Sequence, residues 1–230
     1  MHCTTLVLIA ICCLGTGLSA TTSVPVGTIP ASNFYLNLKS ILRNVPQKQI
    51  EHLVQAYLLN DAEFQAVVRE INSLTTYRLG LQLLNQPEFR QLLQWTSQQL
   101  ILAGGSIKVF EELELEIKVL NKHPHWAQSV NGINGFEQEF SYLYPVAAIR
   151  KLLESSAQQS PVFGEFWRRV VALKPTYERF LATPQATGLA NRLRALGVDV
   201  NNWDATLRYQ LGWSNETLPN YDYEYNYGFY

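Results

Sequence analysis

Side chains able to carry out chemistry are few in this sequence, and histidine is the first type to consider. His123 and His125 flank a proline, and this spacing occurs in metal sites. No cysteine or carboxylate lies beside them in the sequence, so we interpret them as polar residues of a loop. His52 lies between Ile50 and Leu53 of a predicted helix, at the edge of its apolar face. None of these histidines predicts a metal site.

Acidic side chains cluster in one short stretch, which contains Glu111, Glu112, Glu114 and Glu116. Paired carboxylates can act as general acid and general base. On a helix, however, Phe110, Leu113 and Ile117 form the apolar stripe of this stretch, and most of the glutamates fall outside it. We therefore interpret the glutamates as a solvated helix face.

Motifs of known catalytic mechanism are missing from the sequence. It contains no Gly-x-Ser-x-Gly elbow, phosphate-binding loop or dinucleotide fingerprint. The Gly104-Gly105 pair lacks the lysine and the preceding strand that a phosphate loop needs. These absences predict a protein that is not an enzyme and that uses no cofactor or metal.

Composition places the chain among globular proteins of one or two domains. It has 230 residues, of which 47% are hydrophobic and 16% charged, and its formal net charge is −1. The densest basic stretch holds Arg168, Arg169 and Lys174, and the same helix carries Phe166 and Trp167. That arrangement is typical of the solvated face of an amphipathic helix, so we expect no nucleic-acid partner.

The first twenty residues differ in character from the rest. Leu6 to Leu14 is an uncharged apolar run, too short to span a bilayer as a helix, and small residues follow it. We interpret 1–20 as a secretory signal peptide cleaved near Ser19 or Ala20, in preference to a buried N-terminal helix. The segment contains all three cysteines, which are Cys3, Cys12 and Cys13. The mature chain would then be secreted and extracellular, without a disulfide, and would depend on its apolar core.

Helical periodicity organises the remainder of the chain. After a flexible, extended segment at 21–31, apolar residues recur at i, i+3, i+4 and i+7, and no stretch alternates as a strand does. Particular residues mark the breaks between helices. Pro46 can start a helix, Asn60 can be an N-cap and Gly197 can end a helix. The breaks predict helices at 32–43, 46–58, 61–72, 75–85, 87–102 and 107–120, and then at 136–143, 145–157, 161–173, 175–182, 184–196 and 200–212.

One pattern of the chain occurs twice. Its first copy is Pro46, Ile50, Phe64 and Ile71, and its second copy, 99 residues later, is Pro145, Ile149, Phe163 and Val170. The offset then shortens, because Pro87 pairs with Pro184 and Gly104 with Gly197. This predicts a single all-α domain at 32–213, made of repeats at 32–120 and 136–213 that are joined by a linker at 121–135.

The C-terminal segment 214–230 has another composition. Aromatic residues alternate with polar and acidic ones from Tyr221 to Tyr230 without an apolar helix face, so we predict a disordered, tyrosine-rich tail. The sequon Asn215-Glu216-Thr217 begins in this exposed region, and it predicts glycosylation at Asn215.

Several of these motifs resemble a known family. Val45-Pro46, the segment from Tyr57 to Gln65 that reads YLLNDAEFQ, and the Gly-Val-Asp-Val at 197–200 are similar to the insect allergen-related repeat. That family includes the cockroach group 1 allergen, microvillar proteins of the insect midgut and nitrile-specifier proteins of caterpillars. The resemblance covers 32–213. It departs from the family at 159–162, where Gln-Ser-Pro-Val replaces the first copy's Asn-Asp-Ala-Glu.

The resemblance implies a twelve-helix capsule, built from duplicated six-helix modules around an apolar cavity that holds fatty acids or phospholipids. It also implies secretion in the insect midgut, in the lumen or at the microvillar surface, and a role in digestion or lipid handling. Periodicity adds the inward-facing candidates for the cavity lining, which are Ile50, Leu53, Val54, Phe64, Val67, Ile71, Ile149, Leu152, Leu153, Phe163, Phe166 and Val170. It does not separate residues that line a cavity from those that pack helix on helix, and a solid core is the commoner outcome.

Three functions remain as hypotheses. The first is a secreted, non-catalytic lipid-binding protein. The second is a detoxification protein that redirects the breakdown of plant defence compounds, for which His123 and His125 are the candidate polar groups. The third is a structural protein of the gut lining or the membrane surface, for which the tail from Tyr221 to Tyr230 is the candidate region.

Overall fold

The computed structural model describes two stretches of the chain, residues 34–103 and 130–216. The predicted signal peptide, the segment at 21–31, the predicted helix at 107–120 and most of the linker and tail lie outside these residues. Within the two stretches all regular secondary structure is α-helical, which confirms the predicted all-α class.

The helices follow the predicted order. The first stretch contains α2 (Phe34–Leu42), α3 (Gln47–Asn60), α4 (Ala62–Ile71), α5 (Leu74–Leu84) and α6 (Pro87–Leu102). The second contains α7 (Gly132–Leu143), α8 (Val146–Gln159), α9 (Pro161–Ala172), α10 (Lys174–Leu181), α11 (Pro184–Ala195) and α12 (Val200–Gln210).

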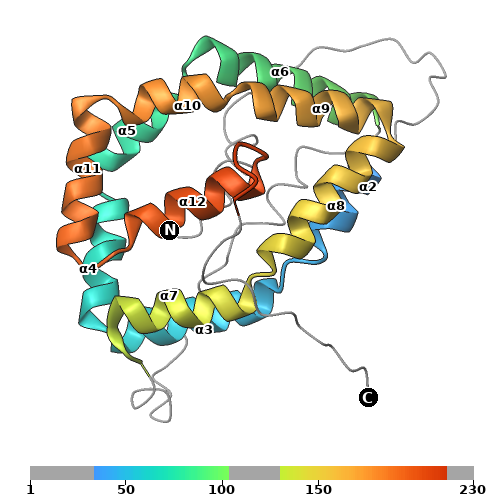
Figure 1. Ribbon diagram of the computed structural model, residues 1–230. Coiled ribbons are helices and arrows are strands. Elements are labelled where there is room, and N and C mark those ends of the chain that lie inside the picture. Colours follow the sequence, from blue (N-terminus) through green and yellow to red (C-terminus); the bar gives the residue numbers. More distant parts are fainter. Residues whose placement is uncertain (1–33, 104–129, 217–230) are drawn as a thin grey trace, which may run out of the picture.

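Each stretch runs round one layer of a four-sided frame, and α12 lies inside the frame (Figure 1). The first helix of each layer packs against two helices of the other layer. Helix α2 packs against α8 and α9 of the second stretch, and α7 packs against α3 and α4 of the first. In the same way α4 contacts α11, and α9 contacts α6. Every side of the frame therefore joins segments that are far apart in the sequence.

The two stretches share local geometry where the sequence pattern is repeated. Pro46 precedes α3 with φ −78° and ψ 65°, and Pro145 precedes α8 with φ −81° and ψ 69°. The N-caps of α4 and α9 are also alike, since Asp61 has φ −116° and ψ 118° and Ser160 has φ −125° and ψ 117°. The repeated pattern thus gives the same turns twice.

The structure corrects two predictions about these turns. Asn60 is not the N-cap of α4 but the last residue of α3, and its side-chain amide donates to the Ala56 carbonyl at 2.8 Å. The cap is Asp61, because its extended backbone lets its carboxylate accept the Phe64 N–H at 2.7 Å. Pro46 lies just before the helix rather than at its first position.

Helix α7 begins at Gly132, whereas the sequence predicted a linker through 135. Two carboxylates from the start of α4 stabilise this earlier start. Asp61 Oδ2 accepts the Gly132 N–H at 2.9 Å, and Glu63 Oε2 accepts the Ile133 N–H at 3.3 Å. Gly132 has φ +66°, and an added Cβ would lie 2.4 Å from Glu63 Oε2. Contacts from a distant helix therefore set this boundary.

The core contains two aromatic clusters, and each one joins the two stretches. In one, Phe34 of α2 lies against Phe163 and Phe166 of α9, with ring centroids 5.8 and 5.4 Å away. In the other, Phe64 of α4 lies 4.4 Å from Phe136 of α7. All five side chains are buried. Burial of large rings between layers is a major source of stability in a protein of short helices.

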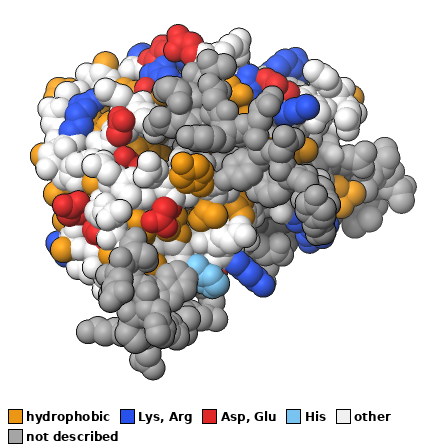
Figure 2. All heavy atoms as spheres, turned by 60° about the horizontal axis from the view of Figure 1, so that its bottom comes forward, with side chains coloured by type: hydrophobic (Ala, Val, Ile, Leu, Met, Phe, Trp, Pro, Cys, Tyr) orange, Lys and Arg blue, Asp and Glu red, His pale blue; other side chains and the backbone are white. Residues whose placement is uncertain are grey.

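The surface carries mixed charge. Figure 2 shows acidic and basic side chains spread over one face, with hydrophobic side chains among them. Some of the ion pairs link the layers, as Arg192 of α11 does with Glu70 of α4 at 2.8 Å. In the described stretches, no helix combines the length and apolarity that crossing a bilayer requires.

We expect the two N-caps to differ in their contribution to stability. Asp61→Ala removes acceptors from the starts of both α4 and α7, and it should lower the free energy of unfolding by about 2–3 kcal/mol. Ser160→Ala removes one cap and should cost about 1 kcal/mol. Urea denaturation of the two variants measures the difference. Equal losses would mean that the contact between Asp61 and Gly132 contributes nothing.

Candidate functional site

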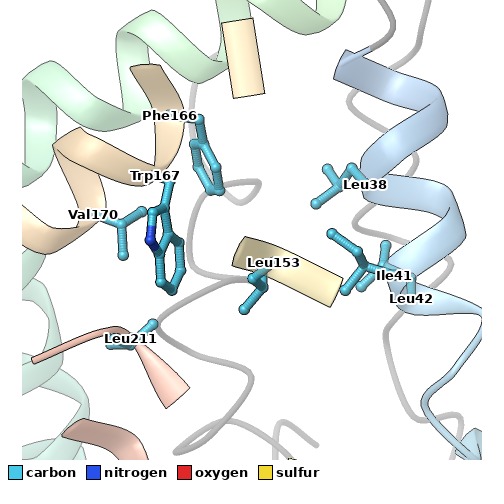
Figure 3. Close-up of a pocket in the computed structure, with 8 residues that line it drawn as sticks. All are labelled: Leu38, Ile41, Leu42, Leu153, Phe166, Trp167, Val170 and Leu211. Carbon is cyan, nitrogen blue, oxygen red and sulfur yellow. The ribbon is translucent and has the colours of Figure 1, made fainter. Parts of the chain in front are cut away.

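An apolar cavity lies where α2, α8, α9 and the end of α12 meet (Figure 3). Its volume is about 20 Å³. All of its lining side chains are hydrophobic, and Figure 3 shows them pointing toward one another across the space. They are Leu38, Ile41, Leu42, Leu153, Phe166, Trp167, Val170 and Leu211. The walls therefore offer apolar contact and no polar recognition.

Helical spacing explains how the walls are assembled. Leu38, Ile41 and Leu42 are spaced i, i+3 and i+4, so they form one face of α2. Phe166 and Val170 lie one turn apart on α9. The two helices contact each other, and their apolar faces meet at the cavity.

A polar contact holds the end of α12 beside the cavity. The Arg150 guanidinium of α8 donates to the Tyr209 carbonyl near the end of α12 and to the Glu154 carboxylate. It also lies 5.5 Å from the centre of the Trp167 ring, a distance suited to a cation–π contact. Arg150 thus fixes Trp167 and the end of α12, from which Leu211 reaches the cavity.

A volume of 20 Å³ is close to the space one water molecule needs. Water in a protein interior requires polar partners, and these walls are almost entirely apolar. The cavity therefore suits an apolar group better than a water molecule. An acyl chain is much larger than this space.

Of the twelve residues predicted to face inward, three line this cavity, namely Leu153, Phe166 and Val170. Seven others are buried in the core, namely Ile50, Leu53, Val54, Phe64, Val67, Ile149 and Phe163. Ile71 and Leu152 are half-buried against that core. Some of the predicted residues therefore line the cavity, and the others pack one helix against another.

Five cavity residues were absent from the predicted set. Leu38, Ile41 and Leu42 carried a usable signal, the apolar spacing within the predicted helix at 32–43. The repeated pattern starts only at Pro46, so it did not draw attention to them. Trp167 and Leu211 face the cavity because of how α9 and α12 pack, which periodicity does not reveal.

The buried ionisable groups connect helices. The Tyr57 hydroxyl of α3 donates to Glu139 of α7 at 2.6 Å, and burial, with this bond, raises the pKa of Tyr57 to about 12. Glu137 accepts the Trp203 indole N–H at 2.7 Å and the Asp199 N–H at 3.1 Å. Burial raises the pKa of Glu137. Both carboxylates join α7 to other helices.

These polar groups take part in contacts between helices. Tyr57 and Glu137 each have a structural partner, and neither lines the apolar cavity. Among the residues that the structure describes there is no cluster of histidine, cysteine and carboxylate side chains that would hold a metal ion. His123 and His125 lie outside those residues, and Asn215 of the predicted sequon lies within them and is exposed.

Comparison with protein-family models identifies the family. A family model described as insect allergen related repeat, nitrile-specifier detoxification, matches residues 33–204, well over half of the chain. No curated protein matches the sequence.

Tyr57 should make stability depend on pH in the alkaline range. Its pKa is about 12 in the folded state, compared with about 10 in an unfolded chain. Its contribution is therefore fully present below pH 10 and is lost between pH 10 and 12, by about 1.4 kcal/mol per pH unit. Urea denaturation across this range measures the loss.

Tyr57→Phe is the control for this prediction. The variant lacks the hydroxyl and should lose less stability than the wild type between pH 10 and 12. The same slope in both proteins would show that Tyr57 does not carry the pH dependence.

Proposed function

The chain belongs to the insect allergen related repeat family, and on that premise we propose that it is a secreted, non-catalytic protein that binds fatty acids or phospholipids. The architecture that we propose for this function is a capsule of twelve helices. Its two six-helix modules would be duplicates that face each other across an apolar interior. The residues 107–120 would supply the sixth helix of the first module.

One observation carries the lipid proposal: the walls of the cavity between α2, α8 and α9 are hydrophobic throughout (Figure 3). An acyl chain needs no polar recognition along its length. Each methylene group moved out of water onto such walls contributes about 0.8 kcal/mol. A chain of many methylene groups would therefore bind without any catalytic or metal-binding side chain.

The volume of the cavity sets a condition on this proposal. A space of 20 Å³ holds less than an acyl chain, so the walls must separate when a lipid enters. The wall formed by Leu38, Ile41 and Leu42 belongs to a helix of nine residues, α2. Movement of the end of α2 that carries these three residues would enlarge the space between α2 and α9.

The family's description also names nitrile-specifier detoxification. That function would need polar or metal-binding groups, for which the sequence offers His123 and His125. The described residues contain no group of three or more histidine, cysteine or carboxylate side chains that could hold a metal ion. Secretion into the midgut also belongs to the proposal, and lipid binding is its central part. A structural role in the gut lining, through the tyrosine-rich tail, is the other alternative.

The direct test of the proposal is extraction of lipid from the native protein. The secreted full-length chain is purified without detergent, extracted with organic solvent and analysed by mass spectrometry. We expect fatty acids or phospholipids in amounts comparable to the protein. The proposal fails if no lipid co-purifies and no fluorescent fatty acid binds.

A matched pair of variants on α2 tests the position of the site. Leu42 lines the cavity and is half-buried, whereas Leu36 on the same helix is 61% exposed. Leu42→Asn places an amide in the apolar wall and should weaken binding of a fluorescent fatty acid about tenfold, since burying an unpaired amide costs about 1–3 kcal/mol. Leu36→Asn should leave binding unchanged.

Thermal unfolding of both variants shows whether they are folded. If the two folded variants bind the fatty acid equally well, lipid binds elsewhere and this cavity is not the site.

A further inference from the structure

Helix α5 carries an apolar stripe that the described residues leave exposed. Leu74, Tyr77 and Leu81 are spaced three and four residues apart, so they lie on one side of the helix. Their exposed fractions are 61%, 62% and 39%. Leu79, on another side, is buried in the core. A solvated helix face normally carries polar side chains, so this stripe calls for a covering element.

The second stretch shows what covers the same positions there. The stripe residues Leu74, Tyr77 and Leu81 are the first, fourth and eighth residues of α5. The residues at the same places in α10 are Lys174, Tyr177 and Leu181. The Tyr177 hydroxyl donates to Asp204 of α12 at 2.9 Å. The Tyr177 ring lies 5.0 Å from that of Trp213, just after α12. This side of α10 therefore faces α12 and the turn that follows it.

The sequence contains a counterpart of α12 for the first stretch. Ile107 and Phe110 correspond to Val200 and Trp203 at an offset of 93 residues. The segment 107–120 follows α6, as α12 follows α11, and α6 contacts α5. Helix α6 ends at Leu102, so a few residues suffice to bring the start of the segment beside α5.

We propose that the stripe of Leu74, Tyr77 and Leu81 is the docking surface for residues 107–120 of the same chain. The apolar residues of the segment, Phe110, Leu113 and Ile117, match the stripe in character and in spacing. This inference rests on the duplication within the proposed function, and it does not depend on lipid binding.

The two docking surfaces differ in polarity. In the second stretch Lys174 donates to the Trp213 carbonyl at 2.9 Å, and Arg150 donates to the Tyr209 carbonyl. Helix α5 begins with Leu74 where α10 begins with Lys174, and Glu51 lies 99 residues before Arg150. Residues 107–120 would therefore be held by apolar contact, whereas α12 is also held by polar bonds of fixed geometry.

Photo-cross-linking of the full-length protein tests the proposal. Tyr77→p-benzoylphenylalanine places a photoreactive ketone on the stripe, and peptide mass spectrometry identifies what it captures. We expect capture of peptides from 107–120, with a yield at least tenfold above that from Thr75→p-benzoylphenylalanine. Thr75 is an exposed residue on another side of α5, which makes it the matched control. Tyr177→p-benzoylphenylalanine should capture the peptide that contains Trp213.

Capture of a second copy of the protein, of lipid, or of no peptide from 107–120 would overturn the proposal. The experiment is run before and after extraction of lipid with organic solvent and refolding, with circular dichroism to confirm that helices have re-formed. Capture of 107–120 in both samples supports the docking surface whether or not lipid binding is found. Failure of lipid binding and failure of docking are therefore distinguished.

Discussion

Phe34 of α2 packs against Phe163 and Phe166 of α9, and this contact joins the first stretch to the second. The rest of the fold depends on apolar contacts of this kind between the two layers. A helix of eight to sixteen residues has little stability alone in water. Its apolar face must be buried by another helix. In this protein the reciprocal packing of the two layers supplies that burial, as it does again between Phe64 and Phe136. Neither layer buries these faces without the other.

The same constraint accounts for how the polar groups are used. Several charged groups connect helices that are far apart in the sequence. Asp61 and Glu63 complete the start of α7, and Glu137 holds the start of α12. Arg150 holds the other end of α12. Carboxylates near helix N-termini and cations near C-termini also suit the helix dipole. The role of these groups in the structure is to position helices.

Helical periodicity was sufficient to predict the elements, because apolar spacing and proline breaks are local. The range 87–102 for α6 was predicted from Pro87 and the apolar spacing, and the structure confirms it. The start of α7 was predicted wrongly because Asp61 and Glu63, about seventy residues earlier, determine it. The residues that line the cavity could likewise be predicted only where local spacing determines which way they face. Phe166 and Val170 were recognised as inward-facing, but Leu211 reaches the cavity only through the docking of α12.

The two walls of the cavity formed by α12 and α2 are held by different kinds of contact. This difference indicates which wall could move if a lipid binds. Helix α12 buries Thr206 and Gln210, and Gln210 donates to the Tyr144 hydroxyl at 2.7 Å. The buried residues of α2 are Phe34, Leu38 and Ile41, all hydrophobic. Hydrogen bonds have a narrow range of geometry, whereas apolar contacts are non-directional and tolerate sliding. On the lipid-binding proposal, the end of α2 that carries Leu38, Ile41 and Leu42 is therefore the wall that moves, and the end of α12 is the wall against which an acyl chain packs.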